Sequence, residues 1–222
     1  MERNINLQEE TDGKRYSSND MAKLGCDDCR GCSKCCRGME DTIVLDPMDI
    51  FRLSGWLHQT FEELLQERIG LRVVDGMVLP YLKMDEKKNQ CSFLNEQGRC
   101  SIHPARPGFC RMFPLGRLYE QESFQYILQI HECPKEHKTK VKIRKWLDTP
   151  DLNRYEKFTC TWHYFLKEIQ RKSSQVSAEN YAKEMNMLML QTFYVTPYDE
   201  GRDFYEQFEE RLGKIKEIIQ NQ

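Results

Sequence analysis

Half of the ten cysteines in this chain lie within eleven residues, between Cys26 and Cys36. The spacing is a strict three residues as far as Cys35, and Cys36 follows directly. A hydrophobic core does not need this density, because other small apolar side chains pack as well as a thiol and do not oxidise. The run therefore indicates either disulfide bonds or a bound metal. Gly25 and Gly31 give the backbone the freedom to wrap several thiolates around one centre.

The N-terminal residues help to separate these two possibilities. Residues 1–10 lack the apolar region of a secretory signal, and no stretch approaches the run of about 18–20 apolar residues that a membrane span requires. We therefore expect a cytoplasmic protein with no membrane association. Because cytoplasmic thiols stay reduced, the pattern predicts metal binding or catalysis rather than a disulfide framework.

The composition narrows the class of partner. With 222 residues, the chain is long enough to bury a core without disulfide staples. The low hydrophobic fraction of 39% and the charged fraction of 31% predict a well-solvated, helix-rich protein. A net charge of −2 argues against a globally basic nucleic-acid binder, which leaves a protein partner or a substrate.

The residues after the cysteine run alternate between strand and helix signals. Residues 41–46 are rich in β-branched side chains, as in a strand, and Asp46-Pro47 predicts a helix start. Residues 60–63 form a capping box for a second helix. The elements expected here are a strand over 41–46, helices over 47–58 and 60–70, a hairpin over 71–80 that turns at Asp75-Gly76, a hairpin over 91–100, one helical turn from Pro104, and strands over 117–119 and 124–130.

Beyond residue 135 the sequence becomes helical, with apolar residues recurring at intervals of three and four. The expected helices cover 138–146, 153–171, 178–194 and 203–219. The predicted fold class is α+β: a small cysteine-rich half of short antiparallel hairpins and helices around a metal site, packed against a C-terminal helical half. We expect an N-terminal arm over 1–24, a cysteine-cluster metal-binding domain over 25–135 and a helical extension over 136–222.

The spacing of the cysteines leaves the metal open. Structural zinc sites usually combine two C-x2-C pairs separated by a long insert. A tight C-x2-C-x2-C series with a distant Cys-Pro is closer to the iron–sulfur pattern, and Cys133-Pro134 supplies that element here. Adjacent side chains tend to point apart, so Cys35 and Cys36 are not expected to serve one centre equally. The thiols outnumber the ligands of one four-coordinate centre, which indicates two centres or one centre with further reactive thiols.

The stretch Cys29-Arg-Gly-Cys-Ser-Lys-Cys-Cys36 resembles the C-x2-C-x2-C-C signature of the bacterial YkgJ-type cysteine cluster proteins. The stretch Cys100-Ser-Ile-His-Pro-Ala-Arg-Pro-Gly-Phe-Cys110 and the later Cys133-Pro134 match the second half of that pattern. The family is described as a zinc- or iron-chelating domain with eight shared cysteines. Carried over position by position, the resemblance implies the metal ligands Cys29, Cys32, Cys35, Cys36, Cys91, Cys100, Cys110 and Cys133. Cys26 and Cys160 fall outside it, and Cys160 is expected to be a small buried hydrophobe within a helix.

The resemblance also implies a cofactor. The family includes flagellin lysine methylases, which are understood to use an iron–sulfur centre, so a [4Fe–4S] cluster is the first expectation and zinc is the alternative. The resemblance does not extend to the methylase reaction, because no glycine-rich nucleotide-binding loop follows a predicted strand in this sequence. No catalytic residue and no reaction are assigned.

Three residues beside the later cysteines are candidates for cofactor contacts. His103 is either a ligand, a hydrogen-bond donor to a thiolate or a helix-start residue. Arg106 and Arg111 flank the same loop and can offset the negative charge of several thiolates. We expect surface or structural roles for the other histidines, and a solvated helix face for the basic residues 138–145.

Three functions are compatible with these patterns. The first is an iron–sulfur protein that acts in electron transfer or in a modification reaction. The second is a structural zinc module that stabilises a protein-interaction domain. The third is a metal-handling or maturation partner whose thiols exchange metal.

Overall fold

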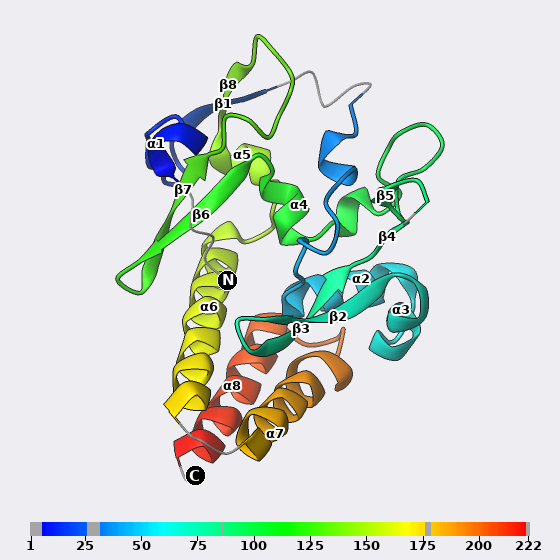
Figure 1. Cartoon of the computed structure of the whole chain (residues 1–222), viewed down its shortest axis with the longest axis vertical. Coiled ribbons are helices and arrows are strands. Elements are labelled where there is room, and N and C mark those ends of the chain that lie inside the picture. Colours follow the sequence, from blue (N-terminus) through cyan, green and yellow to red (C-terminus); the bar gives the residue numbers. More distant parts are fainter. Residues whose placement is uncertain (1–5, 26–31, 86, 176–178, 221–222) are drawn as a thin grey trace.

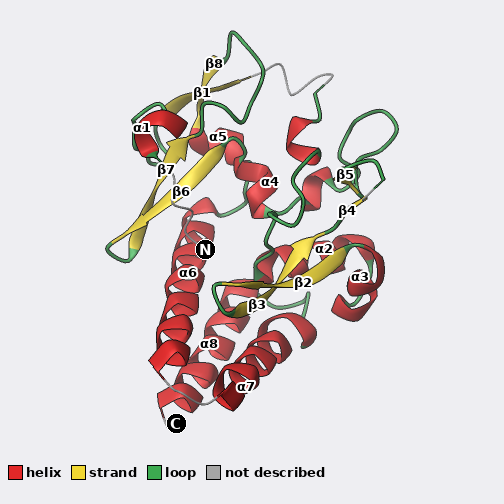
Figure 2. Cartoon of the chain, in the orientation of Figure 1, coloured by secondary structure: helices red, strands yellow, loops and turns green. Residues whose placement is uncertain are grey.

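The computed structural model describes residues 6–25, 32–85, 87–175 and 179–220. Figure 1 shows three long helices gathered at one end of the molecule and a set of short hairpins and helical turns at the other. Within the described ranges, every sheet consists of a single antiparallel pair of strands, as Figure 2 makes clear. The fold is α+β, as predicted. No helix in the described part of the chain is long and apolar enough to cross a membrane.

The N-terminal residues are built into the fold through a strand. Helix α1 (Leu7–Glu10) is followed by strand β1 (Met21–Gly25), which pairs antiparallel with β8 (Thr139–Lys142). Ala22 and Leu24 of β1 are buried. The segment expected as an arm therefore supplies one strand of a hydrogen-bonded pair and part of the core.

The expected helix over 138–146 is wrong in its first half. The structure has strand β8 there, followed by the short helix α5 (Ile143–Leu147). Residues 139–142 read Thr-Lys-Val-Lys, which is the two-residue alternation of a strand. Pairing with β1 gives the backbone of this segment the partners that a helix would otherwise supply.

Two short helices after the cysteine run begin as the sequence predicts. In α2 (Pro47–Leu57), the Asp46 carboxylate accepts from the Asp49 N–H, and the Asp49 carboxylate accepts from the Asp46 N–H in return. In α3 (Phe61–Glu67), Thr60 and Glu63 form the same reciprocal box. Such boxes satisfy backbone donors that a helix start would leave unpaired. Helix α3 ends before residue 70, which lies in the next strand.

The hairpin of β2 (Ile69–Val74) and β3 (Met77–Leu82) turns at Asp75-Gly76, as expected. Both turn residues have positive φ, +49° and +82°, as the tight two-residue turn requires. The strand expected over 41–46 is reduced to a single bridge between Val44 and Tyr81.

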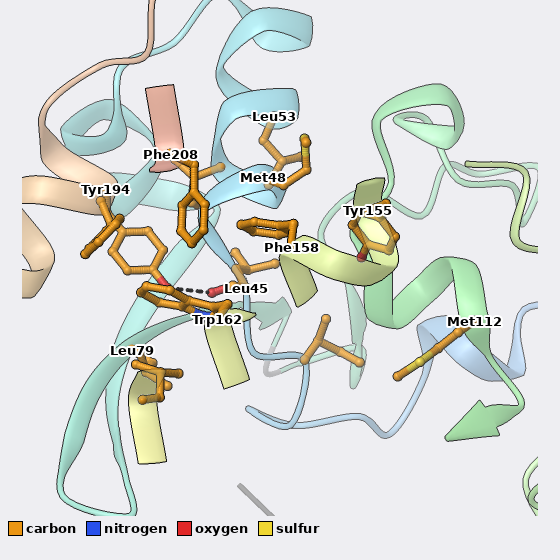
Figure 3. Close-up of a cluster of buried hydrophobic side chains, with 14 of the residues drawn as sticks. Leu45, Met48, Leu53, Leu79, Met112, Tyr155, Phe158, Trp162, Tyr194 and Phe208 are labelled. Carbon is orange, nitrogen blue, oxygen red and sulfur yellow. Dashed lines mark hydrogen bonds between the residues drawn. The ribbon is translucent and has the colours of Figure 1, made fainter. Parts of the chain in front are cut away.

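A proline explains part of that difference. The Leu45 N–H donates to the Pro80 carbonyl, but Pro80 has no N–H to return to Leu45. The Tyr194 hydroxyl donates to the Leu45 carbonyl instead, at 3.1 Å (Figure 3). A side chain from the helical half thus supplies the hydrogen bond that a backbone carbonyl of the cysteine-rich half would otherwise lack.

Two further hairpins follow. Strands β4 (Met84–Asp85) and β5 (Gln90–Cys91) form a short pair, and β6 (Leu115–Glu120) pairs with β7 (Ser123–Leu128). The second pair confirms the strands expected near 117 and 124. The hairpin expected over 91–100 is only a turn with one bridge between Leu94 and Cys100, because Cys91 pairs with Met84.

The helical half confirms the three long predicted helices. These are α6 (Leu152–Gln175), α7 (Glu179–Leu190) and α8 (Phe204–Gln220). Directly after α7 the chain forms one π-helical turn, η4 (Gln191–Val195). The last residues of the helix expected over 178–194 therefore adopt the wider π-helical hydrogen-bond spacing.

Aromatic side chains hold the helical half together. The ring centroids of Phe158 and Phe208 lie 4.7 Å apart, and those of Trp162 and Phe193 lie 5.0 Å apart. Both pairs are edge-to-face, and Figure 3 draws Phe158, Trp162 and Phe208. One continuous cluster of buried side chains joins these rings to Met112 in the cysteine-rich half. The two halves therefore share a core, and their division into separate domains stays a prediction.

Helix α8 offers a matched test of this shared core. Ile215 is 2% exposed, whereas Ile218 is 39% exposed on the same helix. We expect Ile215→Ala to lower the free energy of unfolding by about 2–5 kcal/mol, because it leaves a cavity in the core. Ile218→Ala is expected to change it by less than about 0.5 kcal/mol. Urea unfolding followed by circular dichroism measures both, and equal losses would contradict the inward orientation of Ile215.

Candidate metal centre

Seven of the eight cysteines implied by the resemblance line one cavity of about 640 Å³. They come from stretches far apart in the sequence. The cysteines at the cavity are Cys32, Cys35, Cys36, Cys91, Cys100, Cys110 and Cys133. The eighth, Cys29, lies outside the described residues, as does Cys26. The structure thus brings the seven described side chains together, and their role as ligands stays a prediction.

Short elements and turns position these thiols. Cys35 and Cys36 lie on a 3₁₀ turn, η2 (Lys34–Cys36), and Cys91 ends β5. Cys110 lies on the short helix α4 (Gly108–Met112). Figure 1 shows the blue segment that contains η2 beside α4 and the β4–β5 hairpin. Most of these thiols are half-buried, and Cys91 is buried.

The expectation that Cys35 and Cys36 point apart is wrong. Their Sγ atoms lie 3.9 Å from each other, because the tight η2 turn directs both side chains to the same side. Apart from this pair, the described cysteines are more widely spread. In the described ranges, no three metal-ligating side chains gather closely enough to hold a single ion.

Burial and mutual proximity raise the pKa of several thiols. The pKa of Cys35 is raised chiefly by its contact with Cys36 and then by burial. Burial raises the pKa of Cys91 to about 11 and also raises the pKa of Cys100. The pKa of Cys110 is raised by burial and then by the nearby Cys91 and Cys35. These thiols therefore influence one another electrostatically, as expected of cysteines that line one cavity.

Arg106 faces this set of thiols. Its guanidinium acts electrostatically on Cys35 and Cys100 in the direction that favours their thiolates. Its Nε is buried and finds no hydrogen-bond partner among the described residues. A buried donor of this kind is costly unless something accepts from it. Arg106 is therefore suited to donate to the sulfur atoms of a bound centre.

His103 begins a 3₁₀ turn, η3 (His103–Ala105), at the cavity wall. Partial burial, together with the positive charge of Arg106, lowers its pKa. This shift favours the neutral ring, which is the form that can bind a metal or accept a hydrogen bond.

Arg111 supports the loop rather than the thiols. Its side chain is buried, and its guanidinium donates to three backbone carbonyls, those of Pro104, Arg106 and Asp148. The bond from Nε to the Arg106 carbonyl is 3.1 Å long. Arg111 therefore fixes the segment between His103 and α4 against the residue that follows α5.

The sequence did not single out Asp49 for the site, although it connects α2 to α4. Asp49 is 1% exposed, and its Oδ1 accepts from the Gly108 N–H at 2.8 Å. A Cβ atom at Gly108 would collide with the Tyr155 hydroxyl of α6. Gly108 thus lets α4, which carries Cys110, pack closely against the helical half. Only the helix-cap pattern marked Asp49 in the sequence, and that pattern gives no sign of a distant partner.

Of the remaining candidates, Cys160 and His163 lie outside the cavity, and the basic segment contributes Lys145 to its lining. Cys160 is half-exposed rather than buried, and its Sγ donates to the Glu122 carbonyl at 3.0 Å. His163 is buried in α6 and stacks on Tyr119 with ring centroids 3.6 Å apart. Strand β8 interrupts the basic segment, whose Lys138 donates to the Cys133 carbonyl at 3.0 Å. These residues have structural contacts and do not add to the ligand set.

Seven thiols, the His103 imidazole and the Arg106 guanidinium line one cavity, which is the donor set of a cysteine-rich metal-binding domain. Residues 28–134 match the family model named CxxCxxCC, whose description is "Putative zinc- or iron-chelating domain". This match confirms, for that part of the chain, the resemblance seen in the cysteine pattern. No curated protein and no solved structure matches the chain significantly.

The contacts of Arg111 lead to a test of how the loop is held. Lysine keeps the positive charge but cannot reach three carbonyls, so Arg111→Lys is expected to lower the free energy of unfolding by about 2 kcal/mol. The exposed ion pair Arg202–Glu210 provides a control. Arg202→Lys should change the free energy of unfolding by less than about 0.5 kcal/mol. Urea unfolding measures both variants, and an unaffected Arg111→Lys protein would refute the role of the three contacts.

Proposed function

We propose that this protein carries an iron–sulfur cluster, most simply a [4Fe–4S] cluster, in the cysteine-lined cavity. The observation that carries the proposal is the convergence of seven thiols on one cavity of about 640 Å³. A single structural zinc ion needs four ligands about one central point. A cluster contains several metal ions and sulfides, so it requires a chamber, and cysteine thiolates are its usual ligands.

The chemistry around the thiols supports this fit. The orphaned Nε of Arg106 is placed to donate to cluster or cysteine sulfur, and such hydrogen bonds are known to tune a cluster. Apolar side chains, including Ile43, Leu82 and Ile102, line the same cavity and limit the access of water. Arg111 holds the segment that carries His103 and Arg106, and Asp49 holds the start of the helix that carries Cys110.

Four of the eight family cysteines would hold the cluster, and those left over would serve a second centre or a reactive role. Bound in this cavity, the cluster would supply one-electron redox chemistry. The proposed function is therefore electron transfer or a redox-dependent modification of a protein or small-molecule substrate. We also propose that the protein works in the bacterial cytoplasm, as a relative of the YkgJ-type proteins.

The proposal is tested first on protein purified without oxygen. We expect a brown sample with broad visible absorption that bleaches on reduction with dithionite, and with iron and acid-labile sulfide in equal amounts. A colourless sample that contains stoichiometric zinc and no sulfide would overturn the proposal.

Two cysteine variants then locate the centre. Cys110→Ser removes a thiol at the cavity, so we expect the iron and sulfide content to fall by more than half. Cys160→Ser changes a thiol that bonds to Glu122 outside the cavity, and it should retain full content. Elemental analysis and sulfide titration provide the measurement. Equal metal content in the two variants would exclude the cavity as the site.

A structural zinc site is the second candidate, and one observation favours it. The 3.9 Å between the Sγ atoms of Cys35 and Cys36 suits two thiolates on one tetrahedral zinc ion, which binds each sulfur at about 2.3 Å. This function predicts zinc that a chelator removes with simultaneous loss of the folded state, and no change in absorption on reduction. Zinc retained alongside a full complement of iron and sulfide would indicate two centres.

A further inference from the structure

The two adjacent cysteines of the η2 turn are in direct contact with each other. The Sγ atoms of Cys35 and Cys36 lie 3.9 Å apart, and both residues are free thiols in the structure. Both are only partly buried, and both line the cavity of about 640 Å³. A cavity of this size admits a small molecule. The two thiols are therefore within reach of a small reagent that enters the cavity.

Hydrogen bonds of the turn hold the backbone on which this pair lies. The Cys36 N–H donates to the Ser33 carbonyl at 2.9 Å, and the Arg37 N–H donates to the Lys34 carbonyl at 3.1 Å. The Arg37 Nε–H also donates to the Ser33 hydroxyl at 3.0 Å, which closes the turn with a side chain. The contact between the two thiols thus follows from the folded backbone of residues 33–37.

A disulfide bond between these sulfurs is within reach but strained. The Sγ atoms must approach each other by about 2 Å to reach the S–S bond length of about 2.0 Å. Consecutive Cα atoms lie about 3.8 Å apart across a trans peptide bond, whereas disulfides favour a Cα separation of about 4.4–6.8 Å. Strained disulfides are reduced easily and are the labile, regulatory ones. A bond between neighbouring cysteines is therefore expected to be reversible.

We propose that Cys35 and Cys36 are a site of reversible oxidation, at which the metal-free protein forms a disulfide within the η2 turn. The oxidant is a low-molecular-weight disulfide. The thiolate of one cysteine attacks a sulfur of this oxidant, which forms a mixed disulfide and releases one small thiol. The second cysteine then attacks the mixed disulfide at the sulfur of the first, which forms the bond within the turn and releases the second small thiol. The pair loses two electrons and two protons, and the oxidant gains both.

Oxidation of the pair has a consequence for metal binding. The thiolate is the form of cysteine that binds a metal, so the disulfide withdraws both sulfurs from the ligand set. A bound metal occupies the sulfurs in turn and protects them from the oxidant. The redox state of the turn then controls whether the centre is loaded. This consequence rests on the proposed function, whereas the disulfide itself requires only the geometry of the turn. In a cytoplasmic protein, disulfides are usually transient and redox-sensing.

The sequence around the pair makes the bond measurable. Trypsin cleaves after Lys34 and after Arg37, so it releases the tripeptide Cys35-Cys36-Arg37, which contains no other cysteine. The reduced tripeptide takes up two alkyl groups from iodoacetamide. The tripeptide with an internal disulfide takes up none and is lighter by two hydrogens than its unalkylated reduced form. A bond to any other cysteine produces a linked pair of peptides. Mass spectrometry separates the three products.

The experiment uses the full chain, reduced and freed of metal with a chelator. The protein is equilibrated with oxidised glutathione, alkylated and digested. We expect more than half of the tripeptide to carry the internal disulfide, and dithiothreitol to restore the reduced form. In urea-unfolded protein this fraction should fall about twofold or more, because the turn no longer holds the two sulfurs together. The oxidised protein should take up less than half of the metal that the reduced protein takes up.

Two variants are matched controls. Cys133→Ser removes another thiol at the cavity and leaves the pair intact, so the fraction of internal disulfide should stay the same. Cys36→Ser removes one partner, and the remaining Cys35 should carry a glutathione adduct instead.

Three results would contradict the proposal. The first is a tripeptide that stays reduced while other cysteines oxidise. The second is a tripeptide linked chiefly to other peptides, and the third is an equal yield of internal disulfide in native and urea-unfolded protein. Because the disulfide is measured on metal-free protein, zinc in the purified sample would refute only the proposed function. Likewise, absence of the disulfide leaves the measured iron and sulfide content unchanged.

Discussion

One hydrogen bond, from the Gly108 N–H to the buried carboxylate of Asp49, links the framework of this protein to its cysteine cavity. Asp49 caps α2 through the capping box with Asp46, so its position is set by the helix itself. Gly108 is the first residue of α4, which carries both Cys110 and Arg111. Arg111 in turn donates to the backbone carbonyls of Arg106 and Asp148, two segments that both line the cavity. The same acidic side chain therefore determines where α2 begins and where one thiol lies.

Two tyrosines of the helical half also contact the segments that carry the cavity. Tyr155 of α6 packs against Gly108 so closely that no side chain fits there, and Tyr194 supplies the hydrogen bond that Pro80 cannot give to Leu45. Both contacts are buried and both reach into the cysteine-rich half. The helices are thus part of the scaffold of the cavity, and the continuous core gives the two halves a common stability.

The features that were predicted correctly depend on local signals. The helix start at Asp46-Pro47, the capping box at Thr60 and the turn at Asp75-Gly76 each involve neighbouring residues only, and the long helices follow from their apolar spacing. The features that were missed depend on distant partners. Residues 139–142 became a strand because β1 lies beside them, and the bond between Asp49 and Gly108 spans residues that no local pattern relates. The orientation of Cys35 and Cys36 depended on a 3₁₀ turn, whose geometry the sequence alone did not indicate. Family resemblance pointed to the convergence of the cysteines, whereas the bonds from Arg111 to three separate backbone carbonyls became visible only when the segments were assembled.

The pairing of β1 with β8 has a consequence for how the cysteines meet. Gly25 lies opposite Thr139, and the eight cysteines of the family pattern all lie between these two residues. The strand pair therefore closes the cysteine-bearing chain into a loop through backbone hydrogen bonds alone. Closing a loop restricts its segments to a small volume and raises their effective concentration for one another. Strand pairing thus helps to hold thiols that are far apart in the sequence within one region of the fold.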